Sequence, residues 1–370
     1  MNSYRRFIFV SILAGSIPSF GFADFSSSSR GTTSGTFLKL PAGARAVSMG
    51  EAYGAVADDA SALYWNPAGL TQIPGGDLTL MHGAYIESSF YDYAAYGQNL
   101  GTYGAFGVSG QFLSVGNITQ TDTLGNQIGT FNPHDMAISL GYAHTVAGFS
   151  LGLSGKFIQS TILNTAQTEA VDLGVLSPWF LQERLKLGLT ATNLGGQLKF
   201  EQEGADLPRA YRVASEIKLT DSWIGSLDGV LPNDNAPYIA LGTEYSLKFP
   251  HNLGISFRGG LNSRNYQDLQ GLNSFSLGVG VSVNPISIDY AFLPMGDLGY
   301  TQRVGFSYHW GGSPQETKEE QTPPQQEQQP QHKHRLQKKD DSKSQLPTMK
   351  EMFEKRFGEI HVTNVEGVDP

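Results

Sequence analysis

The chain has 370 residues, a formal net charge of −9 at pH 7, 44 glycines and no cysteine. This negative charge argues against a nucleic-acid partner, which would need a basic face, and the lack of cysteine excludes disulfides and acyl attachment through a thiol. With 11% aromatic and only 16% charged residues, the composition favours a protein rich in strands and turns.

Residues 1–23 are predicted to be an export signal. Arg5 and Arg6 precede an apolar run from Phe7 to Ile17, and Gly21 to Ala23 form a small-residue cleavage site. The apolar run is shorter than the roughly 20 residues that a membrane-spanning helix needs. No later window offers 18 consecutive apolar residues, so the sequence gives no support for a role in the membrane through helices.

Residues 24–75 are predicted to fold as a plug, which we call the hatch. Alanine and glycine dominate residues 43–69 and permit close backbone packing, while Asp58, Asp59 and Ser61 can cap a short helix over 60–65. That helix should stop near Asn66, because a proline follows it. Arg45 is expected to pair with Asp58 or Asp59 in a poorly hydrated interior. The candidate hatch residues are Arg45, Asp58, Asp59, Asn66, Pro67 and Gly69.

Residues 76–310 read as a series of strands of about ten residues with period-two alternation, separated by turn residues. In Phe275–Val283, for example, every second residue is large and apolar while Ser276, Gly278, Gly280 and Ser282 occupy the other face. This pattern is typical of a transmembrane β-barrel, in which only a closed sheet satisfies all backbone groups. The predicted fold class is therefore all-β, an antiparallel barrel of about fourteen strands. These start near residues 77, 90, 102, 135, 148, 168, 184, 208, 221, 236, 251, 272, 285 and 298. A secreted β-sandwich or propeller is the alternative.

The last strand has its own signature. Gly305, Phe306, Tyr308 and Trp310 resemble the terminal signal by which outer-membrane barrels are recognised for assembly. Alternation places the three aromatic residues on one face, where an interfacial girdle belongs.

The composition changes after Trp310. Residues 311–346 are rich in Gln, Pro, Lys and Glu and are predicted to be a disordered linker. In residues 347–370, Thr348 and Glu351 can form a capping box for a short helix. That helix would present Met349, Met352, Phe353 and Phe357 on one face. This helix is either a tethered peptide for a periplasmic partner or a frayed tail.

Two motifs carry a resemblance to a known family. The run FLKLPAGARAVSMGEAYGAVADDASALYWNPAGL, from Phe37 to Leu70, resembles the N-terminal signature of the PorV/PorQ family, a branch of the FadL-like outer-membrane barrels. Asn66 to Leu70 is similar to an element of the fatty-acid transporters in that superfamily. Ile288–Phe292, Gly296–Gly299 and Gln302-Arg303 resemble the final hairpin of PorV-like proteins.

The resemblance implies a fourteen-stranded barrel in the outer membrane of a Gram-negative-type bacterium, in contact with membrane lipid and with its C-terminal tail in the periplasm. The PorV branch implies an accessory of type IX secretion, with secretion components or cargo proteins as partners. The transporter branch implies passage of a hydrophobic small-molecule ligand through a hatch and a lateral wall opening. The glycine-rich stretch Tyr103–Gly110 could supply a wall kink for that opening.

Catalysis is not expected. The sequence has no G-x-S-x-G nucleophile elbow, no H-E-x-x-H and no phosphate-cradling loop. His134 beside Asp135 is better explained as loop chemistry than as a catalytic dyad. His332 and His334 lie in the linker without further ligands, so neither a metal nor a cofactor is predicted.

Overall fold

The computed structural model describes residues 27–85, 88–266, 274–296 and 299–311, all within one compact unit. The predicted export signal (1–23), nearly all of the predicted linker, and the tail residues Met349, Met352, Phe353 and Phe357 lie outside the described residues. Within the described ranges, no helix combines the length and the apolar character needed to cross a bilayer.

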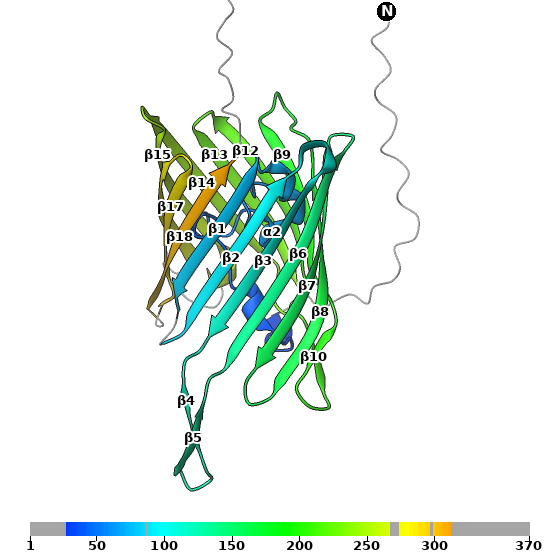
Figure 1. Cartoon of the computed structure of the whole chain (residues 1–370), viewed down its shortest axis with the longest axis vertical. Helices are drawn as coiled ribbons and strands as arrows, with labels where there is room; N and C mark the ends of the chain where they lie inside the picture. The colour runs from blue at the N-terminus through cyan, green and yellow to red at the C-terminus, as the bar shows by residue number, and fades with distance from the viewer. Residues whose placement is uncertain (1–26, 86–87, 267–273, 297–298, 312–370) are drawn as a thin grey trace, which may run out of the picture. The chain divides into compact units, whose positions relative to one another are not determined.

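Fourteen strands form one closed antiparallel barrel, in which β1 pairs with β2 on one side and with β18 on the other (Figure 1). This confirms the predicted fold class, and each barrel strand begins within three residues of its predicted start. The barrel strands are β1 (Gly76–Ala84), β2 (Phe90–Asn99), β3 (Ala105–Ser114), β6 (His134–Val146), β7 (Phe149–Thr161), β8 (Thr165–Leu176), β9 (Leu185–Gly195), β12 (Ala210–Thr220), β13 (Trp223–Pro232), β14 (Tyr238–Phe249), β15 (Leu253–Asn262), β16 (Phe275–Val283), β17 (Ile286–Pro294) and β18 (Tyr300–Trp310).

Two small hairpins were not predicted. The pair β4 (Ile118–Thr121) and β5 (Gln127–Phe131) projects well beyond the barrel rim, and the pair β10 (Gln197–Lys199) and β11 (Gly204–Asp206) lies at the same end (Figure 1). A short helix, α3 (Ser263–Tyr266), follows β15. We call this end of the barrel the loop end. The opposite end, where β1 begins and β18 ends, carries short connections such as 147–148 and 284–285 and is called the turn end.

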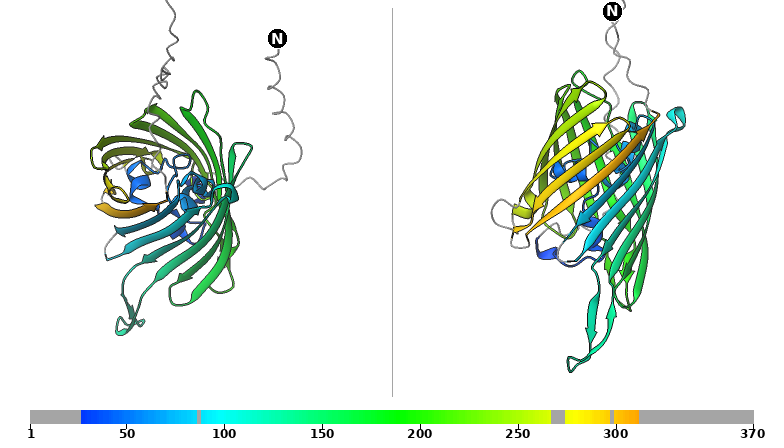
Figure 2. Two further views of the ribbon diagram at one scale, coloured as in Figure 1. Left: turned by 45° about the horizontal axis from the view of Figure 1, so that its top comes forward. Right: turned by 60° about the vertical axis from the view of Figure 1, so that its left-hand side comes forward.

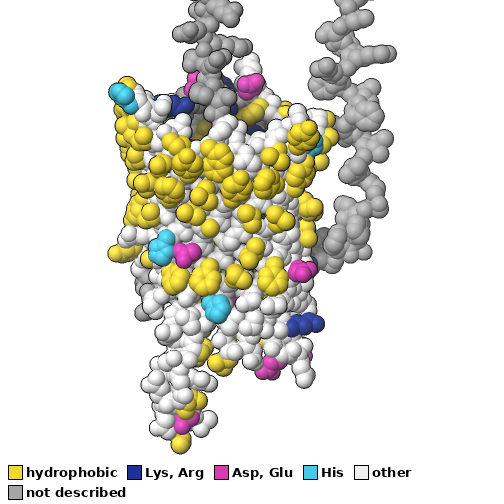
Figure 3. Space-filling view, in the orientation of Figure 1, with side chains coloured by type: hydrophobic (Ala, Val, Ile, Leu, Met, Phe, Trp, Pro, Cys, Tyr) yellow, Lys and Arg dark blue, Asp and Glu magenta, His cyan; other side chains and the backbone are white. Residues whose placement is uncertain are grey.

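Successive side chains along each strand point alternately outward and inward. Most of the outward ones are large and apolar, and many of the inward ones are small or polar. In β16, Leu277, Val281 and Val283 are exposed whereas Ser276 is buried, as the period-two pattern predicts. Large apolar side chains form a broad belt around the outside of the barrel (Figure 3). Such a belt is the surface that a bilayer would cover.

The hatch fills much of the lumen instead of pairing with the wall (Figure 2). Its elements are η1 (Ser27–Ser29), η2 (Thr36–Lys39), α1 (Ala44–Ser48), α2 (Ala62–Trp65) and η3 (Pro67–Gln72). The largest fully buried side chains are concentrated there and include Phe37, Met49, Tyr53, Leu63 and Trp65. The core of the molecule is therefore the interface between hatch and wall.

The expected wall kink at Tyr103–Gly110 is wrong. Strand β3 pairs residue by residue with both β2 and β6, without a register shift. The irregularities of the wall lie elsewhere, between Val171 and Leu173 on β8 and between Lys218 and Thr220 on β12. The glycines of β3 instead leave room for neighbouring side chains, since Gly107 faces Leu63 of the hatch.

Glycines on the inner face allow the hatch backbone to approach the wall backbone. A Cβ atom on Gly260 of β15 would overlap the backbone of Met49 and Gly50, and one on Gly152 of β7 would overlap Pro67 and Ala68. By contrast, the outward-facing Gly259 has no atom nearer than 3.9 Å to such a Cβ. The hatch can seat only because the wall has no side chain at these inward positions.

We predict that Gly260→Val unseats the hatch while the barrel still forms, because overpacking of this kind costs about 1–3 kcal/mol or more. Limited trypsin digestion should then cleave after Lys39 or Arg45, and the folded barrel should keep its heat-modifiable migration on gels. The matched control is Gly259→Val, which should leave the hatch protected. Equal protection in both variants would contradict the close-approach argument.

Candidate functional site

The candidate site is the hatch together with the lumen wall that holds it. Its second helix, α2, is preceded by Asp59, whose carboxylate accepts hydrogen bonds from the backbone N–H of Ser61 at 2.9 Å and from the Ser61 hydroxyl. The side chain of Ser61 itself makes no capping bond to the helix. Thus Asp59 orders the entry to α2, and the predicted capping by Ser61 is wrong.

Asn66 ends α2 as the sequence predicts, with extended backbone angles before Pro67. It is fully buried, its Nδ2 donates to the Gly54 carbonyl at 2.8 Å, and its Oδ1 accepts from the Ala68 N–H at 3.1 Å. A Cβ atom on Gly69 would overlap the carbonyl of Ala57. Asn66, Pro67 and Gly69 together make the turn that folds the hatch back on itself.

Arg45 joins the hatch to the wall. Its Nε and Nη2 donate to both carboxylate oxygens of Glu244 on β14, at 2.8 and 2.9 Å. Its Nη1 donates to Asp58 and to the hydroxyl of Tyr53. The predicted partner Asp58 is therefore one of two, while Asp59 bonds to the Tyr53 hydroxyl instead, at 2.8 Å.

The ion pairs continue along the wall beyond Glu244. Arg258 on β15 contacts Glu244 and also Asp289 on β17, the latter at 2.6 Å. Glu244, Arg258 and Asp289 face inward from three strands, and nothing in the local sequence of each strand marks them as partners. The chain Asp58–Arg45–Glu244–Arg258–Asp289 therefore links the hatch to β14, β15 and β17.

Two buried aspartates on the wall hold hatch backbone groups. Asp228 on β13 accepts from the N–H groups of Tyr53 and Gly54, at 3.1 and 2.9 Å, and pairs with Arg212 at 2.7 Å. Asp77 on β1 accepts from the N–H of Ala60 at 2.7 Å. These bonds satisfy donors that an irregular buried segment would otherwise leave unpaired.

The hatch contains one carboxyl group that titrates near neutral pH. Burial, and then the neighbouring carboxylates of Asp77 and Asp58, raise the pKa of Asp59 to about 6. The neutral form of Asp59 is thus favoured in the folded state, so its contribution to stability is present at low pH and is lost as the pH rises through about 6.

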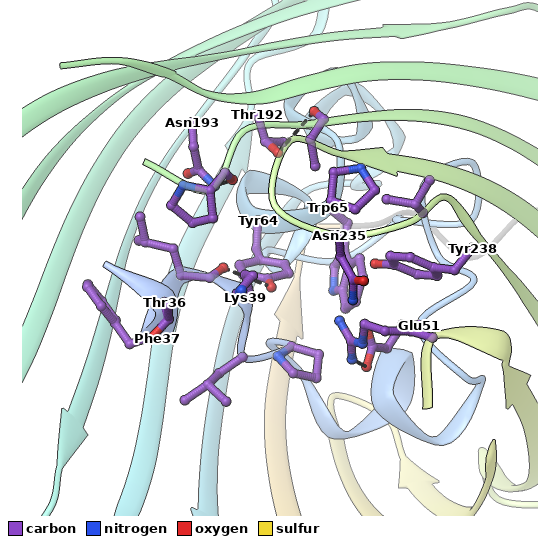
Figure 4. A pocket seen from close by; sticks show the side chains of 18 of the residues that line it. Thr36, Phe37, Lys39, Glu51, Tyr64, Trp65, Thr192, Asn193, Asn235 and Tyr238 are labelled. Atoms are coloured by element: carbon purple, nitrogen blue, oxygen red, sulfur yellow. Dashed lines mark hydrogen bonds and ion pairs between the residues drawn. The ribbon is translucent and has the colours of Figure 1, made fainter. Parts of the chain in front are cut away.

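A cavity of about 500 Å³ lies in the lumen, lined by residues 36–41, Glu51, Tyr64 and Trp65 of the hatch and by wall residues toward the loop end. Figure 4 shows Phe37 and Lys39 of η2 and Tyr64 and Trp65 of α2 beside wall residues such as Tyr238. The apolar part of the lining also includes Leu38, Leu40, Leu113, Val230, Leu293 and Met295. The volume falls in the range of roughly 300–1,000 Å³ that is typical of small-molecule sites.

Most charges that line this cavity are neutralised by neighbours. Lys39 pairs with Asp234 at 2.6 Å, Lys156 with Asp172 at 3.0 Å, and Arg264 with Glu51 at 2.7 Å. Arg212, paired with Asp228, also lies over the ring of Trp65 at 5.2 Å. The cavity therefore combines aromatic and aliphatic surface with neutralised ion pairs, neutral polar side chains such as Thr192 and Asn193, and one cation without a carboxylate partner, Arg303.

The terminal strand places its aromatic residues as the sequence suggests. Phe306 and Tyr308 are exposed on the outer face, and Tyr308 and Trp310 lie 5.9 Å apart by ring centroids. Gly305 faces inward, toward Ala44 of the hatch. The role of these four residues in assembly stays a prediction.

One histidine lies between a hydroxyl group and a carboxylate: the Nε2 of His309 is 3.3 Å from the Ser287 Oγ, and its Nδ1 is 2.6 Å from the Asp77 Oδ2. The predicted neighbours His134 and Asp135 instead bond to other residues. Asp135 accepts from the hydroxyl of Ser160, and the ring of His134 contacts the carbonyl of Asn132. No cluster of three or more potential metal ligands occurs among the described residues. Two His–Asp pairs were not predicted from the sequence: His309 with Asp77, and His82 with Asp92, whose Nδ1 and Oδ1 atoms lie 2.6 Å apart on the outer wall. The strand register could have revealed both, since each pair occupies opposite positions of two neighbouring strands.

We predict that Arg45→Met loosens the hatch by about 3 kcal/mol, because it leaves a buried carboxylate without one of its partners. Hydrogen exchange of backbone amides in residues 44–60 should speed up accordingly. Arg209→Met, which breaks an exposed pair with Asp206, is the control and should change exchange by less than about 1 kcal/mol. Unchanged exchange in Arg45→Met would show that packing alone holds the hatch.

The chain resembles one protein family and several solved barrel structures. The model of an uncharacterised protein family, UPF0164, matches residues 20–167, and no curated protein matches the chain. The monoaromatic hydrocarbon channel CymD is 12% identical with a TM-score of 0.50, covering 73% of this chain and 98% of its own. The toluene transporters TodX of Pseudomonas putida and TbuX of Ralstonia pickettii are each 12% identical over 73% of this chain and 98% of theirs, with TM-scores of 0.49 and 0.46. The chain thus shares its barrel fold with CymD.

Proposed function

We propose that the chain is an outer-membrane channel for hydrophobic small molecules. The orientation follows from its two ends, because bacterial barrels carry short turns in the periplasm and longer loops outside. The loop end, with the β4–β5 and β10–β11 hairpins, then faces the medium, and the turn end faces the periplasm. The cavity then lies in the outer part of the lumen, beside hatch residues that contact the loop end, such as Lys39.

The observation that carries this proposal is the lining of the cavity. Tyr64, Trp65 and Phe37 of the hatch present aromatic surface to it, and wall residues such as Val230 add aliphatic surface. Four of its five lining cations have carboxylate partners. The fifth, Arg303, donates to the Pro41 carbonyl and lies over the ring of Tyr91, so a ligand would meet one cation that no carboxylate balances. An apolar body with few polar groups suits such a site.

The hatch makes this channel selective. Its backbone contacts the wall at Gly152, near the turn end, and at Gly260, near the loop end. A ligand in the cavity can therefore pass only if hatch contacts rearrange. Ion pairs such as Arg45 with Glu244 set the cost of that rearrangement.

Filling the cavity tests the proposal. Val230→Trp should lower uptake of radiolabelled toluene or of a long-chain fatty acid by about tenfold, the change expected from about 1.4 kcal/mol of lost binding. Val279→Trp, on the outer face of β16, is the matched control and should leave uptake unchanged. Both variants would be compared in cells that lack the native protein, at equal amounts of folded barrel. Undiminished uptake of both probes by Val230→Trp would refute the channel proposal.

A PorV-type role in secretion is the second candidate. It rests on the sequence resemblance and on the β4–β5 hairpin, which stands clear of the barrel and exposes Leu124 and Ile128 for contact with another protein. Deletion of the gene should then strand cargo proteins in the periplasm. Normal secretion in the deletion strain would remove this candidate.

A further inference from the structure

A hollow of about 580 Å³ lies on the outer wall of the barrel, away from the lumen cavity. Register places one row of outward residues across it, running from β18 to β6: Phe306, Leu80, Ala94, Gly110 and Ile138. The two small residues occupy the middle of the row, and the three large ones flank them. A Cβ atom on Gly110 would meet nothing within 4 Å.

A polar pair adjoins this hollow. His82 and Asp92 occupy the next outward row, one pleat nearer the loop end than Leu80 and Ala94, and both also line the hollow. Their side chains are 66% and 42% exposed, although the surrounding face carries the apolar belt of Figure 3. Ionisable groups on a lipid-facing surface are costly and so point to a functional site.

We propose that the hollow and the pair together bind a membrane lipid with a hydroxyl-bearing headgroup. The acyl chain would lie over Ala94 and Gly110, and the headgroup would contact His82 and Asp92. The His82 Nδ1 and Asp92 Oδ1 atoms bond to each other, which leaves the imidazole Nε2 and the carboxylate Oδ2 available to a ligand. A hydroxyl group both donates and accepts, so a headgroup with several hydroxyl groups can bond to both atoms. An ammonium group would use only the carboxylate, and a phosphate only the imidazole.

The positions of the polar pair and of the hollow along the strands fit a lipid in one leaflet of the bilayer. The polar pair lies on the loop-end side of the hollow, and the hollow extends from it toward the middle of the strands. With the loop end outside, the headgroup would point outward and the chain toward the bilayer centre. The ligand is therefore a lipid of the outer leaflet, and the cost of the exposed polar pair falls near that interface.

This site is independent of the proposed channel. Its lining side chains Leu80, Phe112, Ile138 and Phe306 point away from the lumen, and the cavity behind the loop end is lined by other residues. Loss of lipid binding should leave uptake of hydrophobic probes unchanged, and a failed channel test would not affect the lipid site.

The amount of lipid that stays bound to the purified protein tests the proposal directly. The purified full-length chain would be titrated in detergent with a monoglucosyl diacylglycerol and with phosphatidylcholine of the same acyl chains, and bound lipid counted by native mass spectrometry. The native chain should retain one glucolipid at a lower lipid concentration than it needs to retain one phosphatidylcholine. Gly110→Leu should weaken retention of that lipid by about tenfold, because its side chain occupies the space of buried methylenes. Asp92→Asn should remove the preference for the glucolipid over phosphatidylcholine.

Matched variants separate these effects from general changes in the barrel. Gly229→Leu alters another outward glycine whose Cβ would meet nothing within 4 Å, and Glu169→Gln alters another outward carboxylate, on β8. Both should bind like the native chain. Unchanged retention in Gly110→Leu, or equal retention of the two lipids by the native chain, would overturn the proposal.

Discussion

The structure depends on the ion pairs that Glu244 makes with Arg45 and Arg258. A fourteen-stranded barrel is wider than its inward side chains can fill, so the interior must be either watery or occupied by another segment. Here the inward faces carry buried charges, and an unpaired buried charge is strongly unfavourable. Glu244 receives one guanidinium from the hatch and one from the wall. The wall and the hatch therefore each complete the charge balance of the other.

The same arrangement divides the lumen. Contacts through Asp77, Asp228 and the inward glycines hold the hatch across the barrel, so the space toward the loop end becomes a separate cavity. Because Tyr64 and Trp65 belong to the hatch, the segment that closes the barrel also supplies the apolar surface of the cavity. Closure and ligand binding thus involve the same residues.

Much of the fold and part of the candidate site could be predicted from the sequence. The contacts that could not be predicted depend on the tertiary structure. Strand periodicity is local, so the fourteen strands and the faces of β16 followed from residues such as Leu277 and Ser276. The local turn at Asn66 and Pro67 and the pairing of Arg45 with Asp58 were also accessible. The partners of Glu244 and Asp289 were not, because Arg45 reaches Glu244 only when the hatch is in the lumen, and Arg258 reaches Asp289 across the intervening strand β16. His82 and Asp92 are ten residues apart, and only the strand register brings them together.

The hatch also has a consequence for how the barrel is assembled. Helix α1 contacts β15, β16, β17 and β18, whereas η3 contacts β2, β3, β6, β7 and β8. Strands from the first half of the barrel and strands from its end therefore contact different parts of one segment, and that segment precedes all of them in the chain. When β18 pairs with β1, the seam closes around a hatch that is already covalently joined to β1 at Gly76. The wall then surrounds the hatch laterally, so the hatch can leave the lumen only through an end of the barrel.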